Sequence, residues 1–214
     1  MSCRPAILAA ALALAPLALA AAPHAVQSVS RVDVLRWAGT WYEVARLPNR
    51  FQADCASDVT AHYEPRPDGT LQVTSSCRTP TGRLETAVGT AWRQEGVARG
   101  DAAKLTVSFL PRWLQWLPLG RGDYWVVMLD PNYRFAVVSE PTRHTLWVLS
   151  RSPTLPAEQL GRIVDRLADE GYPIGRLVLT RQSAVVRETG SDQTGPSAAR
   201  ARLMVLLSRR RTIA

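Results

Sequence analysis

Apolar and polar residues alternate along most of the chain between Trp37 and Thr180, with the period of two that half-buried strands show. Turn-forming residues interrupt this alternation at short intervals, as in Pro67-Asp68-Gly69 and Asp130-Pro131-Asn132. Eight strands at such short spacing indicate an all-β protein, either an antiparallel barrel or a sandwich. The predicted strands cover residues 40–47, 59–63, 71–73, 84–93, 105–109, 124–129, 134–139 and 145–150.

One segment departs from this alternation and predicts a helix near the end of the folded region. Leu160, Ile163, Val164 and Leu167 are spaced so that they form one apolar stripe along a helix. Pro156 and Glu158 suit the first turn of that helix, and Gly171 suits its end. A ninth strand is expected over 176–181. A single helix after eight strands argues against a repeating βα fold.

Both ends of the chain differ in composition from its middle. Residues 1–22 have a basic head at Arg4, an apolar run and small residues at Ala20-Ala21-Ala22, which is the pattern of a signal peptide. The alternative is an uncleaved anchor helix, although the run is short for a membrane span. Cys3 precedes the apolar run and is badly placed for acylation. Residues 183–214 predict a disordered basic tail that could contact a membrane or a partner.

The formal net charge is +8, and much of this excess lies in residues 187–211. A basic protein can contact nucleic acid or anionic lipid. Basic residues are not interleaved with aromatic residues along one strand face, so we expect no nucleic-acid groove. An exported protein also meets lipid sooner than nucleic acid. We therefore expect an exported protein that contacts lipid rather than nucleic acid.

Two cysteines remain after removal of the signal segment, and an even pair outside the cytoplasm predicts a disulfide. Cys55 and Cys77 flank the Pro67-Asp68-Gly69 turn, so they lie on facing arms of one predicted hairpin. The alternative is that both are unpaired small apolar residues.

Catalytic and metal-binding motifs are absent from the sequence. His24, His62 and His144 lack the spacing of metal ligands, and there is no nucleophile elbow or phosphate-binding glycine loop. Glu43 shares strand parity with Trp41 and is expected to point inward. Because a buried carboxylate needs a partner, we interpret it as bonded to a Tyr or Arg near the barrel floor rather than as a catalytic group.

Three segments resemble the conserved motifs of the lipocalin family. Gly39-Thr40-Trp41 matches the G-x-W motif of the first strand, and Leu129-Asp130-Pro131-Asn132-Tyr133 loosely matches the T-D-x-x-Y motif, with Leu129 in place of threonine. Leu146 to Arg151 matches the third motif, whose arginine packs across the first tryptophan. The resemblance covers residues 33–182 and is to bacterial lipocalins related to apolipoprotein D in particular.

This resemblance implies an eight-stranded up-and-down barrel with a C-terminal helix, a short ninth strand and a cavity for a small hydrophobic ligand. Gly39, Trp41, Asp130, Tyr133 and Arg151 would form the structural signature, with Trp41 closing one end. Relatives of apolipoprotein D connect a cysteine near the position of Cys55 to the segment after the helix. This chain has no cysteine there, so Cys77 is the available partner.

The expected function is reversible binding and transport of fatty acids or lysophospholipids, without catalysis or cofactor, by a monomer or homodimer in the periplasm or at the outer membrane. Haem or another tetrapyrrole is an alternative ligand, and an isomerase or synthase activity is a less favoured alternative. A further alternative is a barrel that its own side chains fill, with no ligand cavity. Strand parity predicts the lining residues Ala45, Val59, Ala61, Tyr63, Leu105, Val107, Phe109, Tyr124, Val126, Met128, Trp147 and Leu149.

The predicted mouth is surrounded by four loops, of which residues 111–121 are unusually apolar. Exposed apolar loops often mark binding or membrane contact, so this loop is a candidate for peripheral membrane contact. The alternative is that it packs back on the barrel. The residues expected to receive a lipid head group at the mouth are Arg50, Arg83, Arg112, Trp113, Trp116, Arg121 and Arg143.

Overall fold

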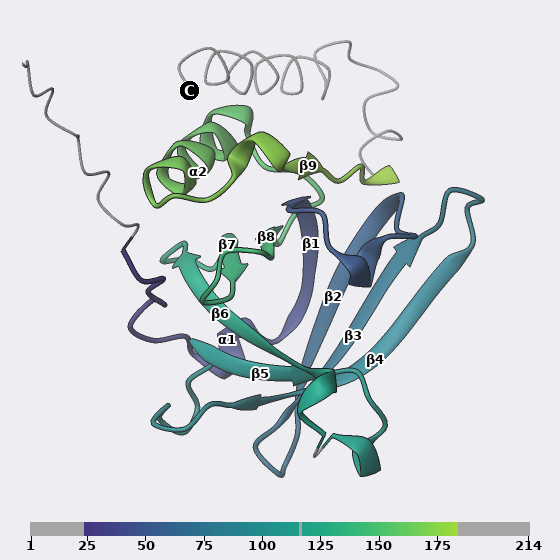
Figure 1. Cartoon of the computed structure of the whole chain (residues 1–214), viewed down its shortest axis with the longest axis vertical. Helices are drawn as coiled ribbons and strands as arrows, with labels where there is room; N and C mark the ends of the chain where they lie inside the picture. The colour runs from purple at the N-terminus through teal and green to yellow at the C-terminus, as the bar shows by residue number, and fades with distance from the viewer. Residues whose placement is uncertain (1–23, 116, 184–214) are drawn as a thin grey trace, which may run out of the picture.

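The computed structural model of the chain describes residues 24–115 and 117–183, in which nine strands form one antiparallel sheet (Figure 1). The predicted signal segment, most of the predicted tail and Trp116 lie outside the described residues. The strands are β1 (Gly39–Arg46), β2 (Ser57–Pro65), β3 (Leu71–Arg78), β4 (Leu84–Arg93), β5 (Lys104–Ser108), β6 (Arg121–Leu129), β7 (Phe135–Ser139), β8 (Leu146–Ser150) and β9 (Val178–Leu179).

The sheet closes on itself because β1 pairs with both β2 and β8. Trp41 lies opposite Ala61 on β2, and Glu43 lies opposite Leu149 on β8. The remaining strands pair in chain order from β2 to β8, and β9 adds to the upper end of β1. The predicted eight-stranded barrel is therefore confirmed, and the sandwich is excluded. The ninth strand is present but shorter than its predicted range.

The predicted helix is confirmed as α2 (Ala157–Asp169), which packs against the outside of the barrel. All four residues of its apolar stripe are buried. The sequence did not predict α1 (Val34–Trp37), because one helical turn is too short to show a periodic stripe. Asp33 caps this turn, since its Oδ1 accepts hydrogen bonds from the backbone N–H groups of Leu35 (2.8 Å) and Arg36 (3.3 Å).

Buried apolar residues form two clusters on opposite faces of the barrel wall. The inner cluster lies inside the barrel and includes Trp37, Trp41, Tyr63, Leu105, Val126 and Leu149. The outer cluster lies between the wall and α2 and includes Val44, Val127, Val137, Val148 and the stripe of α2. Strand alternation divides these two sets, as expected for a sheet with one inward and one outward face.

Two strand irregularities correct the predicted inward face. The register of β6 shifts between Val126 and Met128, and that of β1 shifts between Glu43 and Ala45. A bulge adds one residue to a strand and reverses the parity of everything beyond it. Met128 and Ala45 consequently belong to the outer cluster, so the prediction that they line the interior is wrong.

The disulfide prediction is confirmed between Cys55 and Cys77, whose Cα atoms are 5.6 Å apart. Cys55 lies in the β1–β2 loop and Cys77 lies on β3, so the bond fastens this loop to the barrel wall. Among the described residues, no helix has both the length and the apolar character needed to cross a bilayer.

Candidate ligand-binding site

The lower end of the barrel is closed around Trp41, whose side chain is fully buried. The guanidinium carbon of Arg151 lies 3.9 Å from the centre of the Trp41 ring, as the resemblance implied. Arg151 also donates hydrogen bonds to the carbonyls of Thr40 (2.9 Å) and Trp37 (3.1 Å). Gly39 has φ of +91°, a conformation that favours glycine. These contacts fix the start of β1 beneath the barrel.

Asp130 and Tyr133 organise the β6–β7 turn at this same end. The Asp130 carboxylate accepts hydrogen bonds from Arg134 Nε (3.0 Å) and Nη2 (2.9 Å), and these bonds hold its pKa below its usual range. The Tyr133 hydroxyl accepts a hydrogen bond from the backbone N–H of Asp33 (2.9 Å), so the turn is tied to the segment before α1. Both residues therefore have structural contacts, and neither lies beside a candidate ligand space.

Aromatic rings rise from this floor through the middle of the barrel. The Trp37 ring lies 4.6 Å from that of Trp41 and 5.7 Å from that of Tyr63, measured between ring centres. The hydroxyl groups of Tyr63 and Tyr124 are hydrogen-bonded to each other, and the Tyr124 ring stacks on the Trp147 ring with 6.4 Å between ring centres. Burial raises the pKa of Tyr63 to about 12. The lower half of the barrel is therefore filled by side chains.

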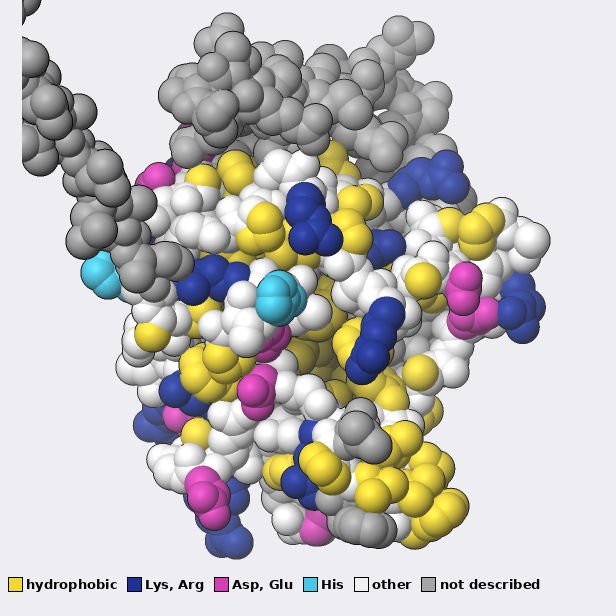
Figure 2. Space-filling view, in the orientation of Figure 1, with side chains coloured by type: hydrophobic (Ala, Val, Ile, Leu, Met, Phe, Trp, Pro, Cys, Tyr) yellow, Lys and Arg dark blue, Asp and Glu magenta, His cyan; other side chains and the backbone are white. Residues whose placement is uncertain are grey.

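The upper half of the barrel is open, because four residues of its inner face retain access to solvent. Ala61 and Val107 pack against the inner cluster. Ser75 pairs with Ala61 on one side and with Ala87 on the other, so these side chains share the inner face. Ala87 is exposed and the other three are half-buried. In the view of Figure 2, the surface of the molecule is hollowed near its centre, and hydrophobic side chains form the floor of this hollow.

The twelve predicted lining residues are divided among several places. Val59 is buried on the same face of β2 as Ala61. Phe109 follows β5 and is half-exposed, and a Cβ added at Gly89 would lie 2.8 Å from its ring. Ala45 and Met128 face α2. The inner cluster, with its partly buried neighbours, contains Ala61, Tyr63, Leu105, Val107, Tyr124, Val126, Trp147 and Leu149.

A buried polar network lies above this aromatic column, near the Arg46 end of β1. Glu43 Oε1 accepts from Arg46 Nη1 at 2.7 Å, and Glu43 Oε2 accepts from Gln52 Nε2 at 2.6 Å. Gln52 Oε1 in turn accepts from Trp147 Nε1 at 2.7 Å. The expected arginine partner of Glu43 is thus present, but above the aromatic column rather than near the floor.

Arg46 and Gln52 were missed by the sequence reasoning. Strand parity assigns Arg46 to the outer face, but the bulge in β1 places it opposite the inward Trp147. Gln52 belongs to a short 3₁₀ turn in the β1–β2 loop, for which the sequence shows no pattern. The Arg46 side chain keeps 12% of its surface exposed, so it can still meet a polar ligand group.

Three of the five arginines predicted to surround the mouth contact residues outside the inner face, so their role in binding a head group stays a prediction. Arg112 faces Asp68 of the β2–β3 turn (3.6 Å), and Arg121 lies over the outward Trp92. Arg143 lies over Tyr172, beyond α2. The other two arginines remain exposed beside the open half. These are Arg50, in the β1–β2 loop, and Arg83, which pairs with Glu85.

The positions of Arg112 and Arg121 follow from where β5 stops. Its ladder with β4 ends at the pair between Thr90 and Ser108, so residues 84–89 of β4 have no partner on that side. The β5–β6 loop (residues 109–120) therefore begins low on the barrel, and Gln115 Nε2 donates to Thr90 Oγ1 on the outer wall at 3.3 Å. Trp113, in this loop, is 73% exposed. Trp116 lies outside the described residues.

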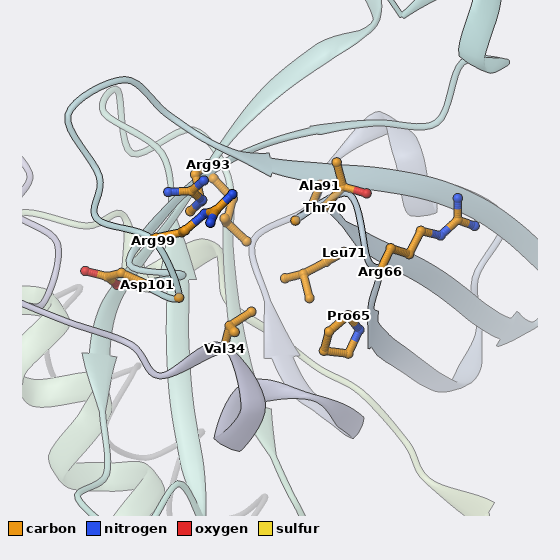
Figure 3. A pocket seen from close by; sticks show the side chains of 12 residues that line it. Val34, Pro65, Arg66, Thr70, Leu71, Ala91, Arg93, Arg99 and Asp101 are labelled. Carbon is orange, nitrogen blue, oxygen red and sulfur yellow. The ribbon is translucent and has the colours of Figure 1, made fainter.

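A separate cavity of about 100 Å³ lies at the closed end, between α1 and the β2–β3 and β4–β5 turns (Figure 3). Arg66, Arg93 and Arg99 line it beside Leu105. Asp101 also lines it, and its Oδ1 accepts from two backbone N–H groups at 2.8 Å. The lining includes none of the four accessible residues of the open half, so this cavity is distinct from the open half of the barrel.

The described residues show neither a metal-binding cluster nor a histidine inside the barrel. They contain no group of three or more His, Cys, Asp or Glu side chains arranged to hold a metal ion. His24, His62 and His144 are exposed, and none of them belongs to the inner cluster. A haem in the open half would therefore find no histidine ligand among these residues.

An antiparallel barrel closed at one end, with an accessible apolar interior, defines a calyx-type ligand-binding protein. The family model described as lipocalin-like domain matches residues 32–182, and the chain belongs to this family. Its members are mainly binding and transport proteins.

Individual relatives agree with this assignment. The chain is 35% identical to temperature-induced lipocalin-1 of Arabidopsis thaliana, over 78% of this chain and 88% of that protein. It is 34% identical to outer membrane lipoprotein Blc of Escherichia coli K12, over 75% and 85%. Apolipoprotein D of Mus musculus is 28% identical, over 71% and 77%. Insecticyanin of Manduca sexta shares the fold, with a TM-score of 0.55 at 17% identity over 72% and 83%.

Proposed function

We propose that the protein binds and carries a fatty acid or lysophospholipid in the open half of its barrel, without transforming it. The observation that supports this most directly is the row formed by Ala61, Ser75 and Ala87. These small side chains face inward yet remain accessible, above a floor that aromatic rings fill. An acyl chain entering this space gains about 0.8 kcal/mol for each methylene that it buries.

The polar network suits the outer end of such a ligand. Arg46 is half of a buried ion pair with Glu43, but part of its side chain remains exposed. Arg50, exposed in the adjacent loop, adds a second positive charge. A carboxylate or phosphate held near these groups would leave its acyl chain pointing down toward Tyr124. The position of Arg46 thus supports an anionic amphiphile as the ligand.

The location and assembly of the protein are part of the same proposal. The relatives named outer membrane lipoprotein Blc support an envelope location, with residues 1–22 as the export signal. We expect a monomer or homodimer.

A bulky residue in the hollow is expected to abolish most lipid binding. Ala87→Trp would place an indole ring where the acyl chain runs and exclude roughly four methylene groups, about 3 kcal/mol. The dissociation constant of hexadecanoic acid should then rise by about 100-fold. Displacement of a fluorescent fatty acid measures this change, and 1-palmitoyl lysophosphatidylcholine tests the second ligand class.

The matched control is Val88→Trp, on the next residue of the same strand. Val88 is exposed on the outer face, so an indole there should leave the affinity unchanged. Equal affinities for wild type and Ala87→Trp would show that the ligand does not occupy the hollow.

We further propose that exposed apolar residues of β4 and of the β5–β6 loop contact an anionic membrane. Phe109 and Trp113 of the β5–β6 segment and Leu84 and Val88 of β4 are exposed large apolar residues. Figure 2 shows hydrophobic side chains gathered at the lower right, over the β5–β6 loop. Arg112, equally exposed in this loop, adds positive charge. Exposed patches of this kind mark membrane or partner contacts.

Trp113→Ser is expected to weaken the binding of the protein to vesicles of phosphatidylglycerol and phosphatidylcholine by about tenfold, since an inserted indole contributes on the order of 1.4 kcal/mol. Cosedimentation measures the partition. Leu35→Ser is the control, because Leu35 is 74% exposed on α1 at the closed end. Equal losses for the two variants would argue for non-specific adhesion instead of a membrane-facing loop.

A further inference from the structure

Two hydrogen-bond donors in the aromatic column below the hollow have no acceptor. The hydroxyl oxygens of Tyr63 and Tyr124 lie 2.5 Å apart, so one phenol donates to the other. Each hydroxyl carries a single proton, and the pair uses only one of the two. Within the part of the chain that the structure describes, neither hydroxyl makes a second hydrogen bond. One phenol proton is therefore left without an acceptor.

A second unused donor lies beside this pair. The Nε1–H of Trp37 is buried and has no hydrogen-bond partner, while its ring lies within 5.7 Å of Tyr63 and 6.5 Å of Tyr124. The neighbouring indoles are satisfied, because Trp41 donates to the Trp37 carbonyl (2.9 Å) and Trp147 donates to Gln52 (2.7 Å). Buried polar groups without partners are rare and costly.

The phenol pair lies where the filled and open halves of the barrel meet. Tyr63 is buried, but Tyr124 faces inward and keeps part of its surface accessible. An inward side chain that solvent can reach borders the hollow. Burial also raises the pKa of Tyr63 to about 12 and that of Tyr124 well above 10, so both phenols remain protonated donors at neutral pH.

We propose that this floor selects ligands with an oxygen acceptor at the end that enters the barrel first, namely acyl chains with a terminal hydroxyl or carbonyl oxygen. The inference rests on the proposed function and specifies the ligand class for the same site. A plain methyl terminus covers the phenol pair and leaves the spare phenol proton without an acceptor. A terminal oxygen accepts a hydrogen bond from that proton.

The test compares two acids of equal chain length, hexadecanoic acid and 16-hydroxyhexadecanoic acid. Wild-type protein is expected to bind the hydroxy acid at least as tightly as the plain acid. In Tyr63→Phe/Tyr124→Phe, the affinity for the hydroxy acid should fall about tenfold while that for the plain acid stays equal or rises. Tyr42→Phe removes a hydroxyl from the opposite face of β1 and should leave the ratio of the two affinities unchanged.

The outcomes separate this inference from the proposed function. If both acids bind and the double variant leaves the ratio unchanged, the donors are satisfied by water and the inference is overturned. If wild type binds the hydroxy acid tenfold more weakly than the plain acid, the floor behaves as an apolar surface and the inference is overturned. This comparison uses wild-type protein alone, so it does not depend on whether the double variant folds. If neither acid binds wild-type protein, the proposed function itself fails.

Discussion

Trp41→Ala is expected to lower the free energy of unfolding by about 3–5 kcal/mol, the usual cost of truncating a fully buried tryptophan. The Trp41 ring is packed between Trp37 and the guanidinium of Arg151, and its Nε1–H donates to the carbonyl of Trp37. The truncation removes all of these contacts and leaves a cavity beneath the barrel. For a domain of this size, the melting temperature should fall by roughly 10 °C.

Chemical denaturation of the oxidised protein, with hexadecanoic acid binding measured in parallel, tests this prediction. Trp113→Ala is the matched control, because the same truncation at an exposed ring should change stability by less than about 0.5 kcal/mol. The variant should lose stability but keep most of its affinity for the ligand, because Trp41 lies under the aromatic column and away from the hollow. A loss of affinity with an unchanged melting temperature would mean that the ligand occupies the other end of the barrel.

The fold was predictable from the sequence because its determinants are local. Period-two alternation located β4 at residues 84–93, and the helical stripe located α2. The motif around Trp41 and the distant Arg151 indicated which residues close the barrel. These signals depend on spacing and residue type, which the sequence displays directly.

The parts of the site that were mispredicted depend on strand pairing. Ala45 and Met128 were assigned by parity, and the bulges of β1 and β6 reverse that parity. The same bulge in β1 turns Arg46 inward, where charge alone predicts an exposed residue. Ser75 and Ala87 were missed because small or polar residues give no apolar alternation. Their place in the wall comes from the β2–β3–β4 register.

The loops show the same limit. Residues 111–121 were expected at the mouth, with packing on the barrel as the alternative. The end of the β4–β5 ladder at Thr90 places the loop against the outer wall, while Trp113 remains exposed. The contact of Gln115 with the wall fits the alternative of packing on the barrel, whereas membrane contact through the exposed Trp113 stays a prediction.

Arg46→Met is expected to lower the free energy of unfolding by about 3–5 kcal/mol, because it leaves the carboxylate of Glu43 buried without its positive partner. Glu43 is 2% exposed, and its other hydrogen-bond partners, Gln52 and Thr180, are neutral. Met fills a similar volume, so loss of the charge should dominate over loss of packing. Arg46 also donates to the carbonyl of Cys55 (3.1 Å), which adds to the cost.

The double variant Glu43→Gln/Arg46→Met separates the charge effect from a general disturbance of the barrel. With both charges removed, most of the lost stability should return, and the coupling energy between the two sites should exceed about 2 kcal/mol. Arg162→Met breaks the exposed Arg162–Glu158 pair of α2 and should cost no more than about 0.5 kcal/mol. A similarly small cost for Arg46→Met would mean that water reaches Glu43 in solution, and the polar network would then be part of the open hollow.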